Sequence, residues 1–286
     1  ALNPNTPKDI IFGTPEEAST TSGQVLDEDK EWLLNSQNYT DEYITSSDNL
    51  KLHSYKIQNT IPSNKWAIVV HGYTSEGINM SSYAKKYYDM GFNVLIPDLR
   101  AHGLSEGDYI GMGFDDRLDI ISWINNILSK NPNAEIVLHG VSMGAATVMT
   151  AVGRDLPDNV IGIGADCGFS SAKDILRCVI KEMKLPVGPA YFLVKLGARI
   201  YGGLDVEETS AVESLKKAKV PILFIHGVDD DFVPCYMTHQ NYEACASDKS
   251  LVLVDKAGHG MSYYVDMKKV EDGVYAFLDK IMKEEK

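Results

Sequence analysis

The sequence predicts an α/β fold built on a mostly parallel central sheet of about eight strands, with helices covering both faces. Short runs rich in Val, Ile and Leu, each of strand length, recur along the chain. Helix-length amphipathic segments lie between most of these runs, an alternation that indicates βαβ crossovers and a parallel sheet. With 286 residues, 44% of them hydrophobic and 23% charged, the chain is long enough to bury a large core in one domain.

The expected strands follow one another in a regular order. EYIT (42–45) and KLHSYKI (51–57) surround the turn sequence SSDN and indicate a hairpin. The later strand-length runs are residues 66–72, 93–98, 134–140, 159–166, 221–227 and 250–255. The expected helices include residues 81–90, 114–130 and 264–283. In such a sheet, functional side chains gather at the carboxyl ends of the strands.

Two segments depart from this alternation. Residues 1–27 are rich in Pro, Thr, Ser and Asn and predict an irregular arm, followed by a short helix that ends near Ser36. We therefore expect residues 1–40 to form an arm and short helix, and residues 41–286 to form the main domain. About fifty residues, roughly 170–218, separate two strands and predict a helical cap insertion; an elaborated crossover is the alternative.

Charge and apolar content bear on the expected partners. The formal net charge is −13, the pI is near 4.9, and no run of basic residues is present, so nucleic acid and anionic membranes are not expected partners. The longest apolar runs are shorter than about 18 residues, so no membrane contact by this chain is expected. The sequence does not indicate whether the chain is a monomer or an oligomer.

No metal site or cofactor is expected. The three adjacent carboxylates at 229–231 cannot all face one cation, and neither an EF-hand nor a histidine cluster accompanies them. Glycine-rich phosphate loops and dinucleotide fingerprints are absent from the sequence. The four cysteines form no C-x-x-C pair, and we interpret them as buried apolar residues: Cys167, Cys178, Cys235 and Cys245.

LHGVSMGAAT (138–147) places Ser142 in a G-x-S-x-G pattern. Alone this pattern is weak, because it arises by chance in about one chain in ten of this length. Its setting is more informative, because a strand-like run precedes it and a helix-compatible segment of small residues follows. A strand-to-helix turn this sharp strains the serine backbone, and Gly140 and Gly144 would remove collisions with neighbouring elements. The pattern therefore predicts an exposed nucleophile.

A serine hydroxyl needs a base, and the base needs an acid to orient it. His259, in KAGHGMS, lies between glycines after the run at 250–255, and HGVDDDFVP supplies three aspartates after the run at 221–227. The order serine, aspartate, histidine is the one expected when these loops follow successive strands of such a sheet.

These motifs together resemble one family. VVHGYTS, DLRAHGLSEG, HGVSMGAAT, HGVDDDFVP and GHGMS, spread over about residues 40–283, resemble α/β-hydrolases of the serine esterase and peptidase-like type. The chain is similar to the prolyl-oligopeptidase-related and acylglycerol-lipase-like bacterial members. The spacing H-G-x-x-D-x-x-V-P in those relatives implies Asp230 as the acid, with Asp166 as the alternative.

The resemblance also implies the supporting groups. The oxyanion hole would be formed by the backbone N–H groups of Met143 and Tyr73. His71 and His226 would be structural, and His102 would brace the site together with Arg100 and Asp98. The apolar residues of 185–201 would form walls of the substrate pocket.

The expected activity is hydrolysis of small carboxylic esters through an acyl-enzyme, with Ser142, His259 and Asp230 as catalytic residues and no cofactor. Two alternatives remain: a hydrolase of small peptides or amides, and a non-catalytic binding protein with this fold. The expected partner is accordingly a small-molecule ester or a short peptide. Relatives whose chains begin like ALNPNTP often follow a hydrophobic anchor, so the resemblance favours an extracytoplasmic location over a cytoplasmic one.

Overall fold

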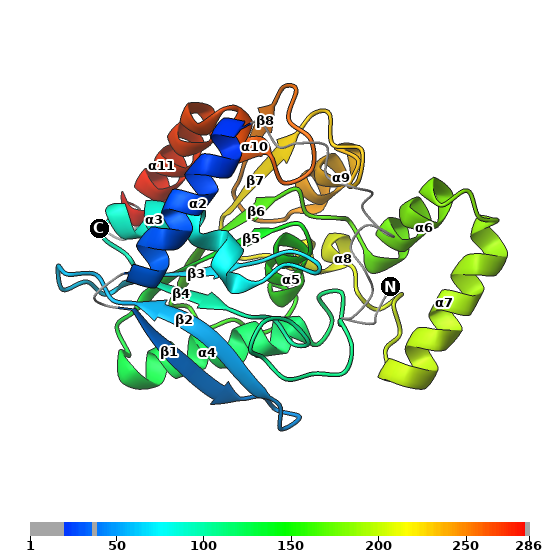
Figure 1. The fold of residues 1–286 in the computed structure, drawn as a ribbon, viewed down its shortest axis with the longest axis horizontal. Coiled ribbons are helices and arrows are strands. Elements are labelled where there is room, and N and C mark those ends of the chain that lie inside the picture. Colours follow the sequence, from blue (N-terminus) through cyan, green and yellow to red (C-terminus); the bar gives the residue numbers. More distant parts are fainter. Residues whose placement is uncertain (1–19, 36–38, 284–286) are drawn as a thin grey trace.

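The computed structural model describes residues 20–35 and 39–283. Its centre is an eight-stranded sheet in the order β1-β2-β4-β3-β5-β6-β7-β8 (Figure 1). Its strands are β1 (Tyr39–Thr45), β2 (Lys51–Ile57), β3 (Lys65–Val70), β4 (Asn93–Pro97), β5 (Glu135–Val141), β6 (Val160–Asp166), β7 (Ile222–Gly227) and β8 (Lys249–Val254). Strand β2 pairs antiparallel with β1 and β4, and all other pairs are parallel. The prediction of a mostly parallel sheet of about eight strands is confirmed.

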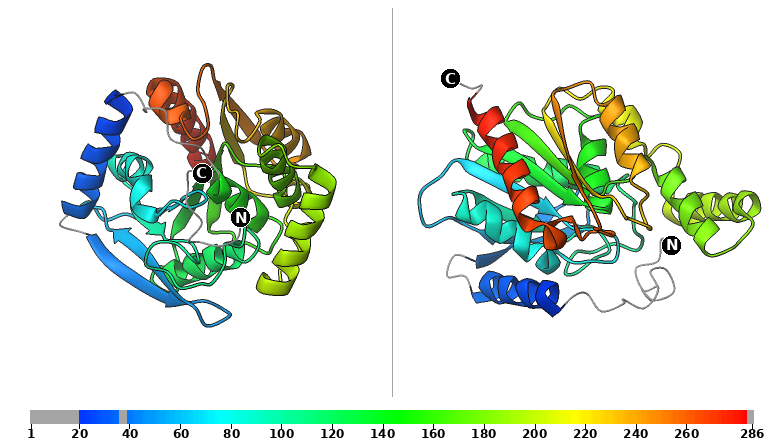
Figure 2. Two further views of the ribbon diagram at one scale, coloured as in Figure 1. Left: turned by 45° about the vertical axis from the view of Figure 1, so that its right-hand side comes forward. Right: turned by 90° about the horizontal axis from the view of Figure 1, so that it is seen from above.

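Helices cover both faces of the sheet (Figures 1 and 2). One face carries α2 (Thr20–Asn35), α3 (Ser81–Asp89), α10 (Ser262–Val265) and α11 (Met267–Lys283). The other carries α4 (Asp116–Lys130), α5 (Met143–Ala151), α8 (Ala211–Leu215) and α9 (Tyr236–Ala244). A 3-10 turn, η1 (Gly77–Met80), precedes α3. Among the described residues, no helix combines the length and apolarity needed to span a bilayer.

The hydrophobic core lies in two layers because successive side chains of a strand point to opposite faces. In β3, Ile68 belongs to the layer that contains Trp123 of α4, whereas Val69 belongs to the layer that contains Tyr87 of α3. All four side chains are buried. Both faces of the sheet are therefore occupied, and its edges and strand ends remain for function.

Three helices differ from the expected boundaries. Helix α2 begins at Thr20, although residues up to 27 were expected to be irregular; residues 1–19 of the expected arm lie outside the described part of the chain. The helix is held against the body by Leu33, which is fully buried, and by Trp32, whose ring packs edge-on against Tyr88. The single C-terminal helix expected at 264–283 is two helices that meet at Asp266.

Two helices occupy the interval between β6 and α8. They are α6 (Ala172–Glu182) and α7 (Val187–Gly202). The chain leaves and returns at one place, where Ser171 and Ser210 form an isolated antiparallel bridge and Ala172 N–H donates to Thr209 O at 3.0 Å. The segment therefore forms a helical hairpin with a closed base, here called the α6–α7 hairpin (residues 172–202).

Candidate active site

Ser142 lies in the tight turn between β5 and α5, with φ 56° and ψ −117°. This left-handed backbone is strained for a residue with a side chain. The prediction of an exposed nucleophile was wrong in one respect, because Ser142 is buried, with 8% of its surface exposed. A Cβ on Gly140 would lie 2.3 Å from the carbonyl of Gly144, and a Cβ on Gly144 would lie 2.2 Å from the carbonyl oxygen of Val70. Both glycines are required because backbone atoms of neighbouring elements fill the space beside them.

The structure brings Ser142, His259 and Asp230 together, although the loops that carry them are far apart in sequence. Nε2 of His259 lies 2.8 Å from Oγ of Ser142, and Nδ1 of His259 lies 2.8 Å from Oδ2 of Asp230. The ionised carboxylate only accepts, so Nδ1 carries the hydrogen and Nε2 is left to accept from the serine hydroxyl. The arrangement has the connectivity of a nucleophile, a base and an orienting acid.

Asp230 is held in its ionised state and in one orientation. Its second oxygen, Oδ1, accepts the backbone N–H groups of Phe232 at 3.0 Å and Val233 at 2.8 Å. Burial opposes ionisation, but hydrogen bonds from His226 and His259 outweigh it and lower the pKa of Asp230 to about 2. The carboxylate therefore retains its charge throughout the neutral range.

Asp166, the alternative acid, points elsewhere. Its carboxylate accepts the hydroxyl of Tyr83 at 2.6 Å and that of Ser262 at 3.1 Å. Burial is the main reason that the pKa of Asp166 is raised. The two partners belong to α3 and α10, so Asp166 joins these helices to the end of β6, and the carboxylate bonded to His259 is that of Asp230.

The expected oxyanion donors belong to two segments that adjoin Ser142. Met143 is the first residue of α5, where backbone N–H groups have no acceptor within their own helix. Tyr73 follows Gly72, and a Cβ on Gly72 would lie 3.2 Å from Cβ of Ser142 and 3.7 Å from its Oγ. The loop that carries Tyr73 therefore passes directly beside the serine.

The histidines expected to be structural fix the loops around the site. His71 donates from Nδ1 to Gly72 O at 2.8 Å and accepts Leu99 N–H at Nε2 at 3.0 Å. His102 accepts Thr74 N–H at 3.1 Å. These contacts tie the loop of Tyr73 to the end of β4.

His226 does the same for the acid loop. It donates from Nε2 to Val233 O at 2.8 Å, and its Nδ1 lies 2.6 Å from Oγ1 of Thr238 on α9. His226 thereby holds the loop that presents Asp230 against the end of β7, and it also contacts α9.

His53 is a supporting residue that the sequence did not single out. Its fully buried ring bridges two carboxylates, with Nδ1 2.7 Å from Asp98 and Nε2 2.9 Å from Asp41. Asp98 in turn accepts the backbone N–H groups of Gly77 at 2.7 Å and Leu104 at 3.0 Å. The edge hairpin is thus linked to the loop beside Ser142 through a buried histidine whose sequence context, KLHSYKI, carries no motif.

One group of side chains has the residue types of a metal site. Sγ of Cys167, a carboxylate oxygen of Asp230 and a nitrogen of His259 lie within 4.8 Å of one another. Asp230 and His259 are already bonded to each other, and burial raises the pKa of the Cys167 thiol well above its usual value. The four cysteines are free, and Cys167 and Cys245 are buried as expected. The same expectation was wrong for Cys178 and Cys235, which are only partly buried.

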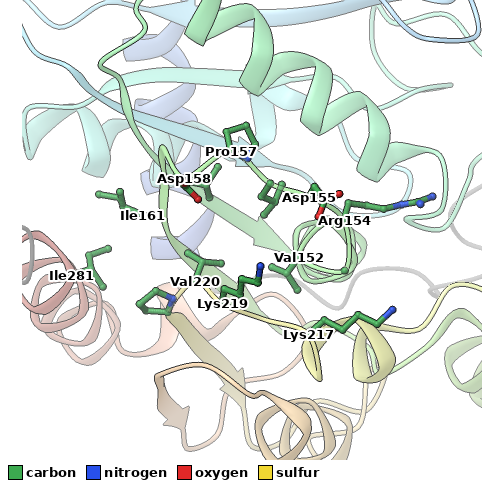
Figure 3. A pocket seen from close by; sticks show the side chains of 14 residues that line it. Val152, Arg154, Asp155, Pro157, Asp158, Ile161, Lys217, Lys219, Val220 and Ile281 are labelled. Atoms are coloured by element: carbon green, nitrogen blue, oxygen red, sulfur yellow. The ribbon is translucent and has the colours of Figure 1, made fainter.

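A surface pocket of about 720 Å³ (Figure 3) is not lined by Ser142, His259 or Asp230. Its lining includes Val160 and Ile161 at the start of β6, and Val220 and Pro221 just before β7. The pocket therefore opens at the amino ends of these strands, whereas Ser142 follows the carboxyl end of β5. Its lining contains no serine, cysteine or histidine.

Comparisons with known proteins agree with the fold. The family described as serine aminopeptidase, S33, matches residues 62–187. YqkD of Bacillus subtilis is 32% identical over 216 residues, which cover 75% of this chain and 71% of YqkD. The chain therefore belongs to the α/β-hydrolase superfamily, as its motifs predicted.

Solved structures extend the comparison. An esterase of Pyrococcus furiosus, Pf2001, is similar with a TM-score of 0.71 and 26% identity, over 88% of this chain and 93% of the esterase. The acylaminoacyl peptidase of Pyrococcus horikoshii is similar in fold, with a TM-score of 0.61 and 18% identity, over 87% of this chain and 42% of the peptidase. The fold is that of esterase-type and peptidase-type hydrolases.

Proposed function

We propose that the protein is a serine hydrolase that cleaves small carboxylic esters through an acyl-enzyme. The observation that carries the proposal is the unbroken hydrogen-bond series from Ser142 through His259 to Asp230, with both distances at 2.8 Å. The strained serine backbone adds to it, because such strain is found where a turn exposes a nucleophile.

The geometry suits each step of acyl transfer. Oγ of Ser142 attacks the ester carbonyl while Nε2 of His259 takes the hydroxyl proton. The backbone N–H groups of Tyr73 and Met143 bind the oxyanion, and loss of one such donor costs about 3 kcal/mol. His259 then gives its proton to the departing alcohol oxygen. Water attacks the acyl-enzyme while His259 takes its proton, and His259 returns that proton to Oγ of Ser142 as the carboxylic acid is released.

Asp230 serves as an orienting charge. Because its pKa is about 2, it stays ionised while His259 is transiently protonated, and it stabilises the imidazolium without taking its proton. The bond to Nδ1 also keeps His259 in the tautomer whose Nε2 faces the serine.

The similarity to Pf2001, which extends over most of both chains, supports an ester substrate. A small-peptide or amide hydrolase is the second candidate, supported by the serine aminopeptidase description of the matching family. We assign residues 170–218 as the cap insertion of the main domain, residues 41–286. This segment contains the α6–α7 hairpin and α8, and it lies between β6, which leads to Cys167, and β7, which leads to the loop of Asp230.

The test is hydrolysis of p-nitrophenyl acetate, butyrate and octanoate beside alanine p-nitroanilide. The proposal predicts turnover of the esters by the wild type and a loss of about 10⁴-fold or more in kcat for Ser142→Ala. Ser129→Ala, a surface serine on α4, is the matched control and should retain full activity. Faster turnover of the anilide would favour the peptidase, and inertness toward all four substrates would favour a non-catalytic binding protein.

A further inference from the structure

The α6–α7 hairpin projects from the body of the protein. In all the views of Figures 1 and 2 it lies at the outer edge, beyond α8 and α9. Its base is closed by the bridge between Ser171 and Ser210. The two helices pack on each other through buried side chains that include Ile180 on α6 and Tyr191 on α7. Most of their remaining surface therefore faces away from the domain.

Helix α7 presents an apolar stripe to solvent. Phe192, Leu196 and Ile200 are spaced by four residues, so they lie on one face of the helix together with Leu193. Their exposed fractions are 64% for Phe192, 44% for Leu196, 66% for Ile200 and 65% for Leu193. These residues were expected to wall the substrate pocket, but the structure turns them outward. A continuous apolar surface of this kind marks a binding site more often than a solvated one.

The hairpin is basic, although the chain as a whole is acidic. Residues 172–202 contain six basic and two acidic side chains, against a net charge of −13 for the complete sequence. Lys173, Arg177 and Lys181 follow one exposed face of α6 at four-residue spacing, and Lys184 and Arg199 add to them.

Some of these charges are available for a partner. Lys195 is bound to Glu207 at 2.7 Å, which neutralises it locally. In contrast, Lys181, Lys184 and Arg199 form no ion pair with any residue in the described ranges 20–35 and 39–283. Within the described part of the chain, these three positive charges on the hairpin therefore lack an ion-pair partner.

We propose that the α6–α7 hairpin docks this protein onto an anionic lipid bilayer, with α7 lying in the plane of the interface. Helices of this type bury an apolar face among the lipid headgroups while neighbouring Lys and Arg side chains attract anionic lipid. The acidic remainder of the chain is repelled by the same surface, which orients the hairpin toward the bilayer. The net charge of the whole chain argues against an anionic membrane as a partner, and the basic hairpin is a local exception to that expectation.

A second copy of the chain fits this surface less well. In a two-fold dimer each patch meets the same patch of its partner. The unpaired cations of one hairpin would then face those of the other, which is unfavourable. A bilayer containing anionic lipid supplies both the apolar layer and the opposite charge.

Co-sedimentation of the full chain with lipid vesicles tests the proposal. The protein should bind vesicles of equal parts phosphatidylcholine and phosphatidylglycerol, bind phosphatidylcholine vesicles much more weakly, and lose affinity as salt is raised. Leu193→Asn with Ile200→Asn should lower the partition coefficient by about tenfold or more, since both substitutions remove apolar side chains that the proposal buries in the bilayer. Ile61→Asn, which alters an equally exposed isoleucine outside the hairpin, is the matched control and should bind normally.

The charge contribution has its own pair of variants. Lys181→Glu with Lys184→Glu should weaken binding by more than about tenfold, because each basic side chain near the bilayer contributes roughly fivefold. Lys217→Glu with Lys219→Glu makes the same change beside the pocket of Figure 3, at the other end of the strands, and should leave binding unchanged. Ser142→Ala should also bind normally, so the result is separate from the proposed esterase activity.

Two results would overturn the proposal. One is equal binding to both vesicle types, or binding that the control variants weaken as much as the hairpin variants do. The other is a dimer in sedimentation velocity, without lipid, that Leu193→Asn with Ile200→Asn converts to a monomer; the stripe would then be an interface between copies of the chain.

Discussion

Gly144→Ala tests the packing that presents Ser142. The added Cβ would lie 2.2 Å from Val70 O and 2.6 Å from His71 O, and such contacts must open to at least 3.0 Å. The obstacles are backbone atoms of β3 and its following loop, so α5 itself has to move away from the sheet. Overpacking of this kind costs about 1–3 kcal/mol in unfolding free energy. A displacement of about 1 Å at the nucleophile lowers the rate by roughly 100-fold.

Urea unfolding and p-nitrophenyl butyrate hydrolysis measure these two effects separately. Gly197→Ala is the matched control, since a Cβ on Gly197 meets nothing within 4 Å. This residue lies inside α7, where alanine in place of glycine should stabilise by about 0.8–1 kcal/mol without changing kcat. If Gly144→Ala kept both wild-type stability and wild-type kcat, the argument that close packing dictates the glycine would be wrong.

Three further predictions concern the acid, a buried histidine and the core. Asp230→Asn should lower kcat by about 10⁴-fold, because the amide favours the wrong tautomer of His259; an unchanged kcat would remove Asp230 from the mechanism. Burial lowers the pKa of His139 from 6.5 to about 3, so the unfolded chain takes up a proton that the folded protein refuses. Stability should therefore fall by about 1.4 kcal/mol per pH unit as pH drops from 6.5 toward 3, and urea unfolding of His139→Asn should lack that slope; an identical slope in the variant contradicts the assignment. Trp123→Ala should lower the free energy of unfolding in urea by about 3–5 kcal/mol, because Trp123 is only 1% exposed, while kcat per folded molecule stays unchanged. A loss under 1 kcal/mol would mean that the surrounding core closes over the cavity.

The centre of the sheet was predictable because β3, β4, β5, β6 and β7 are buried on both sides and are therefore apolar along most of their length. All eight expected runs match the observed strands to within two residues, apart from β1, which begins three residues before the expected run. The position of Ser142 was predictable for a different reason, since backbone crowding on both sides of the turn leaves room only for glycine at 140 and 144. In both cases one strong physical constraint acts on consecutive residues.

Features that depend on contacts between distant segments were not predictable. Helix α9 carries a weak helical pattern, and its buried residues Thr238 and Asn241 contact His226 and Gly168 from other elements. The bridge from His53 to Asp98 joins residues 45 positions apart and exists only after β2 pairs with β4. The outward direction of the stripe on α7 depends on how that helix packs against α6, which the apolar pattern alone does not specify.

Covalent labelling with a fluorophosphonate probe, followed by mapping of the modified peptide, tests the central claim most directly. Such a probe reacts with a serine only when a base and an oxyanion site activate it. The account predicts a single adduct on the peptide that contains Ser142, and no adduct in Ser142→Ala or after unfolding in urea. Labelling at another serine, or none in the folded wild-type protein, would contradict the assignment of Ser142, His259 and Asp230 as one catalytic unit.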